Sequence, residues 1–402
     1  GMPRRKVLQF GVLTAVLASG YGVMFTVLDD FRDEYGIEAI WLGSIVGIGF
    51  LASFVSQVFI APIADRGRAR QLVVLGMMLN VVGLLTMAFS ESLLPLLAGR
   101  LVSGIGVGMA LPSVRRIVIN ADPENIGNNV GLLLASDVTG FAFGPVLSAL
   151  LVPSLGLSAP FLAIAAMTTC LIGLVFRVDI VETPIGAAPS QRFAFDLLRN
   201  RPLVAGLMMG SAIFFMIGTF DALWAIVLDD LGSSEAVANV GITIFALPLV
   251  FFGAYGGRLA QRIGPFRLGP LGLVLGAVYM FLYGWMPTVW AMLAVAIVHA
   301  VSDGLTVTSA GVAVATAAPK ERQAGAQGML GAAETLTGGV TAQLAGALYT
   351  VGGRDLAYTV CSIVMVALAV GAYVLAGPEY RGRRPDDVPT DPDPLSAVTG
   401  HA

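Results

Sequence analysis

Apolar residues occur along this chain in long unbroken runs, and polar residues rarely alternate with them. Each run is roughly 18 to 25 residues long, which is the length that a helix needs to cross the hydrocarbon core of a bilayer. Strands of a membrane barrel would be about ten residues long and would alternate, so helices are the expected elements. The pattern predicts twelve membrane-spanning helices, at residues 7–28, 40–61, 71–89, 93–118, 129–152, 159–177, 203–228, 237–258, 268–286, 289–317, 325–349 and 356–376.

Composition agrees with this pattern. Of the 402 residues, 56% are hydrophobic and 12% are charged, and the mean hydropathy is +0.83. A soluble domain is about a quarter charged. The first apolar run follows basic residues, as in a signal peptide, but it is too long for one. We therefore expect an all-α, multi-pass membrane protein that retains its first helix.

Basic residues gather in alternate loops between the predicted helices. The loops on the other side carry mainly acidic residues, such as Asp29, Asp30, Asp229 and Asp230. Lys and Arg are enriched in cytoplasmic loops, so we expect both termini in the cytoplasm and the protein in the inner (plasma) membrane. The basic loops contain Arg4, Arg5, Lys6, Arg66, Arg68, Arg70, Arg115, Arg116, Arg177, Arg192, Arg199, Arg201, Arg258, Arg262, Arg267, Lys320, Arg322, Arg381, Arg383 and Arg384.

The two halves of the chain repeat one another. TVLDD at 26–30 matches IVLDD at 226–230, and Gly131 matches Gly328 at an offset of 197. The same offset places Asp137 on Glu334, so each half carries one carboxylate inside its fifth predicted helix. Parallel repeats of this kind bind substrate between the halves, near the bilayer midplane.

These features predict four segments. They are an N-terminal six-helix bundle at 1–177, a cytoplasmic linker at 178–201, a C-terminal six-helix bundle at 202–378 and a disordered cytoplasmic tail at 379–402.

Three motifs resemble those of one transporter family. APIADRGRAR at 61–70 is similar to the loop motif of the major facilitator superfamily, although Ala61 replaces its leading glycine. Gly140, Gly144 and Pro145 resemble the antiporter signature, and Arg100-Leu-Val-Ser-Gly104 resembles the motif of helix 4. The chain over roughly residues 5–378 is thus most similar to twelve-helix drug:proton antiporters of that superfamily.

The resemblance implies which helices line the cavity. In this superfamily the first and fourth helices of each half line it, the second and fifth flank it, and the third and sixth face lipid. Ionisable residues lie well inside the predicted helices only at the lining and flanking positions. A charge at a helix centre costs at least about 2.5 kcal/mol on insertion scales, so each one is expected to meet water, substrate or a partner. These residues are Arg100, Asp137, Asp221, His299, Asp303 and Glu334.

Asp137 and Glu334 are the main candidates for proton coupling, because a carboxylate in low dielectric can exchange a proton near neutral pH. His299 and Asp303 are one helical turn apart and are expected to couple, and Arg100 joins the proton-coupling set. A satisfied structural network is the alternative for each of these residues, and for Arg100 a side chain that extends to the membrane surface.

The resemblance also implies gating residues and a ligand wall. Asp65 is expected to contact the N-terminus of the eleventh helix, and Arg66, Arg68 and Arg70 to pair with Glu124 or anionic lipid. Gly140, Gly144 and Pro145 are expected to take part in gating, or else to form an ordinary packing seam. The expected substrate-binding residues are Tyr21, Met24, Phe25, Phe214, Phe220, Asp221 and Trp224, with Asp221 toward the outer vestibule; packing is the alternative for the aromatic and Met side chains.

Other classes of function fit the sequence less well. The chain has two histidines and lacks a His/Cys metal cluster, a phosphate-binding glycine loop and a nucleophile elbow, so neither an enzyme nor a metal or cofactor is expected. The expected activity is proton-coupled efflux of lipophilic neutral or cationic molecules. Proton-coupled uptake of a small metabolite and lipid transport remain alternatives. The expected partners of a monomer are a small-molecule substrate, protons and membrane lipid, without nucleic acid.

Overall fold

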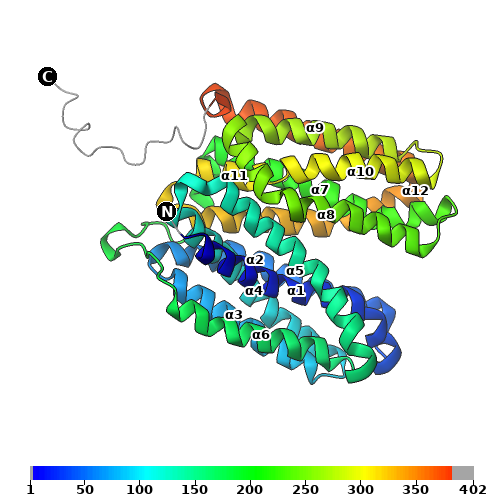
Figure 1. The fold of residues 1–402 in the computed structure, drawn as a ribbon, viewed down its shortest axis with the longest axis horizontal. Helices are drawn as coiled ribbons and strands as arrows, with labels where there is room; N and C mark the ends of the chain where they lie inside the picture. The colour runs from blue at the N-terminus through cyan, green and yellow to red at the C-terminus, as the bar shows by residue number, and fades with distance from the viewer. Residues whose placement is uncertain (1–2, 383–402) are drawn as a thin grey trace.

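The computed structural model describes residues 3–382, and these form helices joined by short connections (Figure 1). The α-helices are α1 (Arg4–Tyr35), α2 (Ala39–Phe59), α3 (Ala69–Ala88), α4 (Leu93–Ala121), α5 (Ile126–Leu155), α6 (Ser158–Arg177), α7 (Arg201–Asp230), α8 (Glu235–Ile263), α9 (Pro265–Tyr283), α10 (Val289–Thr306), α11 (Ser309–Ala317) and α12 (Gln323–Gly382). Five short 3-10 helices connect them, η1 (Ala61–Arg66), η2 (Pro123–Asn125), η3 (Ile185–Ala187), η4 (Phe195–Arg199) and η5 (Lys320–Arg322).

The predicted twelve membrane crossings are present. Eleven helical stretches of the described residues are long and apolar enough to cross a bilayer. The last of them contains α12, whose 60 residues include Gly353 at φ 76 and ψ −172. A straight helix of that length would measure about 90 Å, three times the thickness of the hydrocarbon core. Gly353 therefore separates two crossings, and α10 and α11 together make one.

Two helix ends differ from the predictions. Helix α1 continues through the polar segment after residue 28 and stops where Gly36 adopts φ 68 and donates to the Arg32 carbonyl. Polar residues outside the membrane sustain a helix, so loss of hydropathy does not end it, whereas the left-handed glycine does. Residues 379–382, expected in the tail, are helical, but Gly377 at φ 80 and ψ 163 separates them from the last crossing. The remainder of the predicted tail, 383–402, lies outside the described residues.

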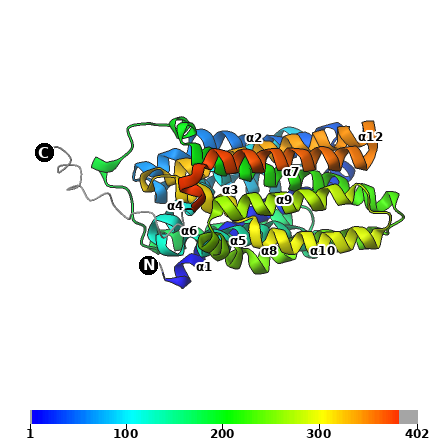
Figure 2. The same cartoon turned by 90° about the horizontal axis from the view of Figure 1, so that it is seen from above.

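The helices form two bundles. Helices α1–α6 make one half and α7–α12 the other, and all run along the long axis of the molecule (Figures 1 and 2). The halves approach each other at the end that holds the start of α1 and the linker, and they diverge toward the opposite end (Figure 1). Each half has its own buried apolar core.

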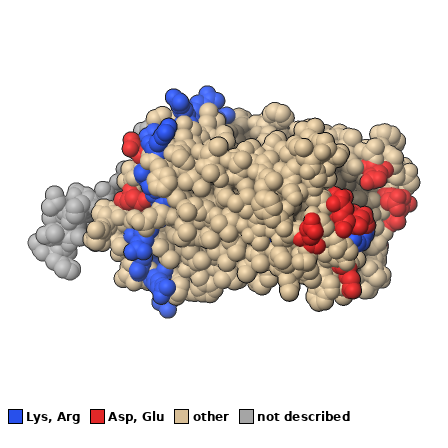
Figure 3. Space-filling model, turned by 90° about the horizontal axis from the view of Figure 1, so that it is seen from below, with Lys and Arg blue, Asp and Glu red and all other residues tan. Residues whose placement is uncertain are grey.

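The two ends of the molecule carry opposite charge. Lys and Arg side chains form a band near one end and Asp and Glu side chains gather at the other, with an uncharged belt between them (Figure 3). We call the end with the linker the basic end and the opposite one the acidic end. Charged groups avoid hydrocarbon, so the uncharged belt is the surface that fits a bilayer.

Small residues bring α1 and α5 together inside the N-terminal half. A Cβ added at Gly144 would lie 2.5 Å from the Ser19 carbonyl oxygen, and one at Gly140 would overlap the Ala15 carbonyl. Gly22 of α1 in turn faces Phe141 and Pro145 of α5. Glycines at four-residue spacing permit this backbone approach. The motif Gly140, Gly144 and Pro145 thus forms a packing seam within one half, and its role in gating stays a prediction.

Candidate functional site at the interface between the halves

At the basic end, α5 and α8 meet through glycines. Gly127 and Gly257 face one another so closely that a Cβ on either would overlap the other's carbonyl, and a Cβ on Gly253 would lie 2.9 Å from the Gly131 oxygen. Gln261 of α8 accepts a hydrogen bond from Gly127 N at 3.0 Å and donates one to the Glu124 carbonyl at 2.6 Å. We call this pair of hydrogen bonds the Gln261 contact. Together these contacts close one side of the interface.

On the other side, Asp65 caps α12. Its carboxylate accepts from the backbone N–H groups of Ala324 and Gly325 at 2.9 and 2.8 Å, and the residue is 2% exposed. The first turn of a helix offers unpaired N–H donors and a positive dipole end, which suit a carboxylate. The expected approach of Asp65 to this helix is therefore present, and we call it the Asp65 contact.

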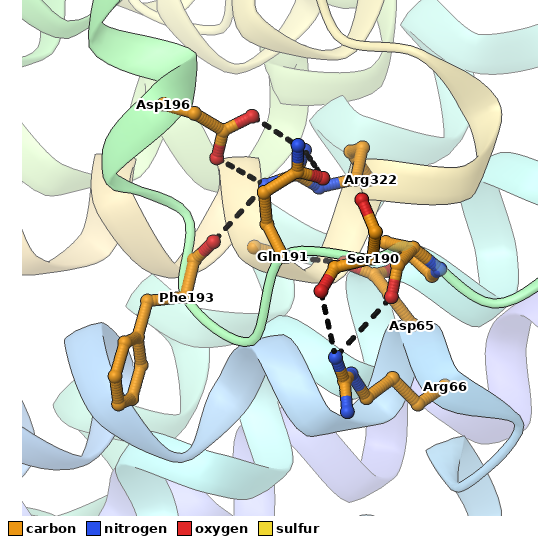
Figure 4. A network of polar contacts seen from close by, with 9 residues as sticks. Asp65, Arg66, Ser190, Gln191, Phe193, Asp196 and Arg322 are labelled. Carbon is orange, nitrogen blue, oxygen red and sulfur yellow. Dashed lines mark hydrogen bonds and ion pairs between the residues drawn. The ribbon is translucent and has the colours of Figure 1, made fainter.

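The linker lies against the Asp65 contact and is held from both halves (Figure 4). Arg66 donates to the Pro189 and Ser190 carbonyls at 3.2 and 3.5 Å. Arg322, from the C-terminal half, donates to both carboxylate oxygens of Asp196 at 2.7 and 2.6 Å. The guanidinium of Arg322 holds the pKa of the Asp196 carboxyl below its ordinary value. The linker is thus bonded to both halves.

Of the two partners predicted for the loop arginines, Glu124 has no described bond to Arg66 or Arg70 in this conformation, and anionic lipid stays a prediction. Arg66 binds linker carbonyls, Arg70 donates to the Phe176 and Val178 carbonyls at 3.2 and 2.7 Å, and Arg68 is exposed. The reason is geometric, because the loop after α2 lies beneath the end of α6 and the linker that follows it.

Above the basic end, a cavity of about 50 Å³ lies between the halves, and we call it the seam cavity. It has room for water but not for a drug-sized ligand, whose sites measure about 300 to 1,000 Å³. Its walls include residues of α4, α5, α7, α11 and α12, among them Arg115, Leu133, Phe214, Gly311, Gln327 and Glu334. The seam cavity is therefore lined by residues of both halves.

Glu334 lines the seam cavity, and Asp137 interacts with it electrostatically from α5. Each lies eleven residues after the start of its helix, α5 or α12, or about 16 Å along the axis. Both side chains are half-buried. Glu334 interacts electrostatically with Asp137 and with Arg115, and Asp137 also interacts with Arg115. Within residues 3–382 neither carboxylate forms an ion pair within 4.0 Å. The two repeat-related acids thus share one cation without a direct bond to it.

Arg115 is the residue that the sequence did not reveal. The charge pattern predicts it as one of the basic loop residues, yet its side chain lines the seam cavity. The neighbouring Arg116 points elsewhere and donates to the Val181 carbonyl and to Thr183 Oγ1 at 2.8 and 3.1 Å. Consecutive helical residues differ by about 100° around the axis, so adjacent arginines can serve different surfaces.

Aromatic side chains of the N-terminal half form a cluster toward the acidic end. Tyr21 stacks on Phe50 at 5.6 Å, and Phe25 contacts Phe141 at 5.7 Å. Phe25 and Phe141 are 47% and 45% exposed. Tyr21, Phe25 and Phe214 are thus accessible in part, as a ligand wall requires. Phe50 and Phe141 join this cluster from α2 and α5, whereas the predicted wall contained only residues of the first helix of each half.

Met24, Phe220 and Trp224 do not line the cavity, which corrects the prediction. All three are 0% exposed. Phe220 stacks on Phe245 at 4.1 Å, and Trp224 Nε1 donates to the Ala238 carbonyl at 3.0 Å. A buried indole N–H needs an acceptor, and the backbone of α8 provides it. Asp221, on another face of α7, is exposed.

Arg100 lies inside the N-terminal half. It is 1% exposed, so its side chain does not extend to the surface. Its guanidinium carbon lies 3.9 Å from the centroid of the Tyr21 ring, and a Cβ on Gly49 would lie 2.7 Å from the same carbon. The described contacts of Arg100 are therefore a cation–π pair and a close approach to α2, away from Asp137 and Glu334.

His299 and Asp303 contact each other as expected from their spacing. His299 Nε2 lies 3.1 Å from Asp303 Oδ2, and its Nδ1 lies 2.9 Å from the Tyr283 hydroxyl. The rings of Phe245 and Tyr279 surround the imidazole. This cluster is built from α8, α9 and α10 within the C-terminal half, where Asp303 reaches a separate cavity of about 10 Å³. The pair exists, and its role in proton coupling stays a prediction.

Comparison with known proteins agrees with this architecture. A family model described as Major Facilitator Superfamily matches residues 10–228 and again residues 218–400. The chain is 26% identical over 302 residues to a protein of Serratia proteamaculans named "Multidrug resistance protein MdtG", which covers 70% of this chain and 73% of the relative. It is 20% identical over 244 residues to "Quinolone resistance protein NorA" of Staphylococcus aureus, which covers 59% of this chain and 62% of the relative.

Two solved structures share the fold. The human organic anion transporter MFSD10 (TETRAN) superposes with a TM-score of 0.69 at 18% identity, over 94% of this chain and 100% of that one. The proton:xylose symporter XylE superposes with a TM-score of 0.76 at 12% identity, over 98% of both chains. At such identities the likeness establishes the fold alone.

Proposed function

Because this chain belongs to the Major Facilitator Superfamily, and is therefore a multi-pass membrane transporter and not an enzyme, we propose that it exports lipophilic neutral or cationic small molecules in exchange for protons. The basic end faces the cytoplasm in this proposal, as the enrichment of Lys and Arg in cytoplasmic loops favours. Relatives named for multidrug and quinolone resistance support efflux over uptake.

One observation carries the proposal. Asp137 and Glu334 come from equivalent positions of the two halves. Glu334 lines the interface beside Arg115, and Asp137 interacts electrostatically with both. A carboxylate there can hold either a proton or a cationic substrate. Exchange of one for the other is the chemistry of an antiporter.

Gating follows from the contacts at the basic end. In the present conformation the Asp65 and Gln261 contacts close that end, while the halves diverge toward the acidic end (Figure 1). Inward opening requires both contacts to break, and the bundles at roughly 1–177 and 202–378 then rock as two bodies about the seam. Arg66, Arg68 and Arg70 keep the linker at 178–201 near this gate.

The transport cycle assigns a step to each part. With both carboxylates ionised, the site accepts substrate from the cytoplasm, against the partly accessible side chains of Tyr21, Phe25 and Phe214. After the basic end closes, protons enter from the acidic end, neutralise Asp137 or Glu334 and release the substrate. Asp221 lies on the way out, at the exposed face of α7.

The test is transport in proteoliposomes with an imposed pH gradient. Substrate movement against inward proton flow supports exchange, and movement in the same direction as protons identifies an uptake symporter instead. Transport that persists unchanged after an ionophore collapses the gradient excludes both. Lipid transport would appear as movement of a labelled phospholipid between leaflets.

Neutral variants test the assignment of the carboxylates. Asp137→Asn and Glu334→Gln should each abolish gradient-driven transport while the protein still elutes as a folded species in size-exclusion chromatography. Full transport by both variants would remove these residues from the mechanism. His299→Gln and Asp303→Asn then test the second predicted proton-coupling pair, and Arg100→Gln tests whether the arginine of helix 4 belongs with it.

A further inference from the structure

Arg115 places a positive charge beside Glu334 on the wall of the seam cavity. It lies six residues before the end of α4, about 9 Å from the basic end, and its side chain lines the seam cavity. Its charge interacts with both Asp137 and Glu334. The remaining groups on the walls come from α5, α7, α11 and α12 and are apolar or uncharged, such as Leu133, Phe214 and Gln327.

The contacts of Arg115 are incomplete in a specific way. Among residues 3–382 it has no ion pair within 4.0 Å and no described hydrogen bond. Gln327 on the same wall has a buried Nε2 without a described hydrogen-bond partner. Arg115 is half-buried. A partly buried charge and a buried amide without partners are both costly, so this part of the interface suits water or a polar part of a ligand. A permanently closed ion pair would leave no such room.

Arg115, Asp137 and Glu334 interact electrostatically as one cluster. The net charge of this cluster determines how much positive charge a ligand can bring. With both carboxylates ionised, the cluster carries one net negative charge, and one bound proton makes it neutral. Without Arg115 the same carboxylates would carry two negative charges. The arginine therefore halves the charge that remains available for exchange.

We propose that Arg115 is a specificity-determining residue that limits the seam site to ligands with a single positive charge. The inference rests on the proposed function, because it concerns the same site. It adds a charge limit to the substrate class, namely lipophilic monocations in preference to dications of similar shape.

Two dyes with one ring system provide the test. Ethidium carries one positive charge, and propidium carries a second on a quaternary ammonium arm. Fluorescence polarisation with the purified full-length protein measures the Kd of each dye. The wild type should bind ethidium on the order of tenfold more tightly than propidium, since an unmatched charge in a partly buried site is unfavourable.

Variants separate charge from shape. Arg115→Gln should bring the two Kd values together or reverse their order, whereas Arg115→Lys should keep the wild-type ratio. The double variant Arg115→Gln with Glu334→Gln again has one negative charge, from Asp137, and should restore the preference for ethidium. A merely structural role for Arg115 would not produce this restoration. Arg177→Gln removes the same charge from an exposed position at the end of α6 and should leave the ratio unchanged.

Three results of the dye assay would contradict the charge limit. The charge limit would be overturned by an unchanged ratio of Kd values in Arg115→Gln or by a double variant that does not regain the preference for ethidium. It would also be overturned if the wild-type protein bound neither dye. Binding does not require a pH gradient, so these results are independent of the liposome assay. The liposome assay can show no proton exchange while the dye ratio still supports the charge limit. It can equally show proton exchange while the dye ratio contradicts the charge limit.

Discussion

The Asp65 and Gln261 contacts occupy equivalent places in the two halves but differ in chemistry. Asp65 corresponds to Gln261 at an offset of 196 between the repeats, and Gly127 corresponds to Ala324 at an offset of 197. Asp65 follows the second helix of the N-terminal half, and Gln261 lies in the last turn of the second helix of the C-terminal half. Each side chain accepts a hydrogen bond, through an oxygen atom, from an N–H in the first turn of the fifth helix of the other half. Asp65 offers a charged carboxylate with two such bonds, and Gln261 a neutral amide with one.

The surroundings of the two contacts differ as well. Beside Asp65 the linker is bonded from both halves through Arg66 and Arg322. Beside Gln261 the backbones of α5 and α8 touch directly at Gly127 and Gly257. One side of the gate is therefore polar and the other is mainly steric. We expect substitutions on the steric side to disrupt closure most. On the polar side we expect each lost hydrogen bond to weaken closure by a smaller amount.

The largest effect is expected from Gly257→Leu. A Cβ there already overlaps the Gly127 carbonyl, so the larger side chain prevents closure of the basic end and shifts the protein to the inward-open form. Transport should fall by at least roughly a hundredfold, as for a clash costing about 3 kcal/mol. Spin labels at exposed positions 177 and 267, in a background without Cys170 and Cys361, would report a longer distance.

Gly173→Leu is the matched control for this substitution. Gly173 lies in α6, and a Cβ added there meets nothing within 4 Å. Wild-type label distances in Gly257→Leu would contradict the steric role of the glycine contact.

Asp65→Ala is expected to have the second largest effect. It removes two charge-assisted hydrogen bonds, which contribute about 1.5 to 3 kcal/mol each at most, and leaves two N–H groups of α12 unpaired. The population of the inward-open form should rise at least about tenfold by the same label distances. If Asp65→Ala changed the distances less than Gln261→Ala, the charged contact would not be the stronger of the two.

Gln261→Ala is expected to have a smaller effect. It removes the neutral hydrogen bonds to Gly127 and Glu124, each contributing about 1 kcal/mol, while the glycine packing remains. A shift of severalfold in the inward-open population is expected, together with transport close to wild type. Loss of transport comparable to that of Gly257→Leu would show that the amide, and not the backbone packing, holds this side.

The smallest effect is expected from acidification of the cytoplasmic face. Arg322 lowers the pKa of Asp196, so the contribution of this pair is complete above the ordinary Asp pKa of about 3.9 and is lost only as pH falls through the lowered value. Between pH 5 and 8 the label distance should therefore not respond to this pair, and Asp196→Asn should have the same pH profile as the wild type there. A transition in that window that Asp196→Asn abolishes would refute this assignment.

Much of the fold was predictable because the bilayer favours helices as the spanning elements and sets the length of each apolar segment that crosses it. Every predicted crossing is helical in the structure, the tenth as α10 and α11 together. The break at Gly353 falls between the last two predicted spans. Asp137 and Glu334 could be found because the repeat and the scarcity of buried charge point to the same two positions. The Asp65 contact followed from a motif and from the charge of a helix N-terminus.

The ligand wall was less predictable. Tyr21, Phe25, Phe220 and Trp224 all belong to the first helix of a half, but that membership does not say which face of the helix turns inward. An apolar helix in lipid lacks a polar face that would mark its orientation, so Phe220 and Trp224 looked the same as Phe25. Their burial depends on the acceptor at Ala238 and the ring of Phe245 on α8.

The sequence by itself determined the membrane class, the twelve crossings, the two-fold repeat and the pair of intramembrane carboxylates, because hydropathy and charge cost act on each segment separately. Only the tertiary structure decided that Arg115 turns from the basic end toward those carboxylates, that the linker bonds to Arg66 and Arg322, and that Arg100 stays within its own half. These placements depend on the rotation of each helix about its axis and on which distant backbones meet, and neither quantity is encoded in any single segment.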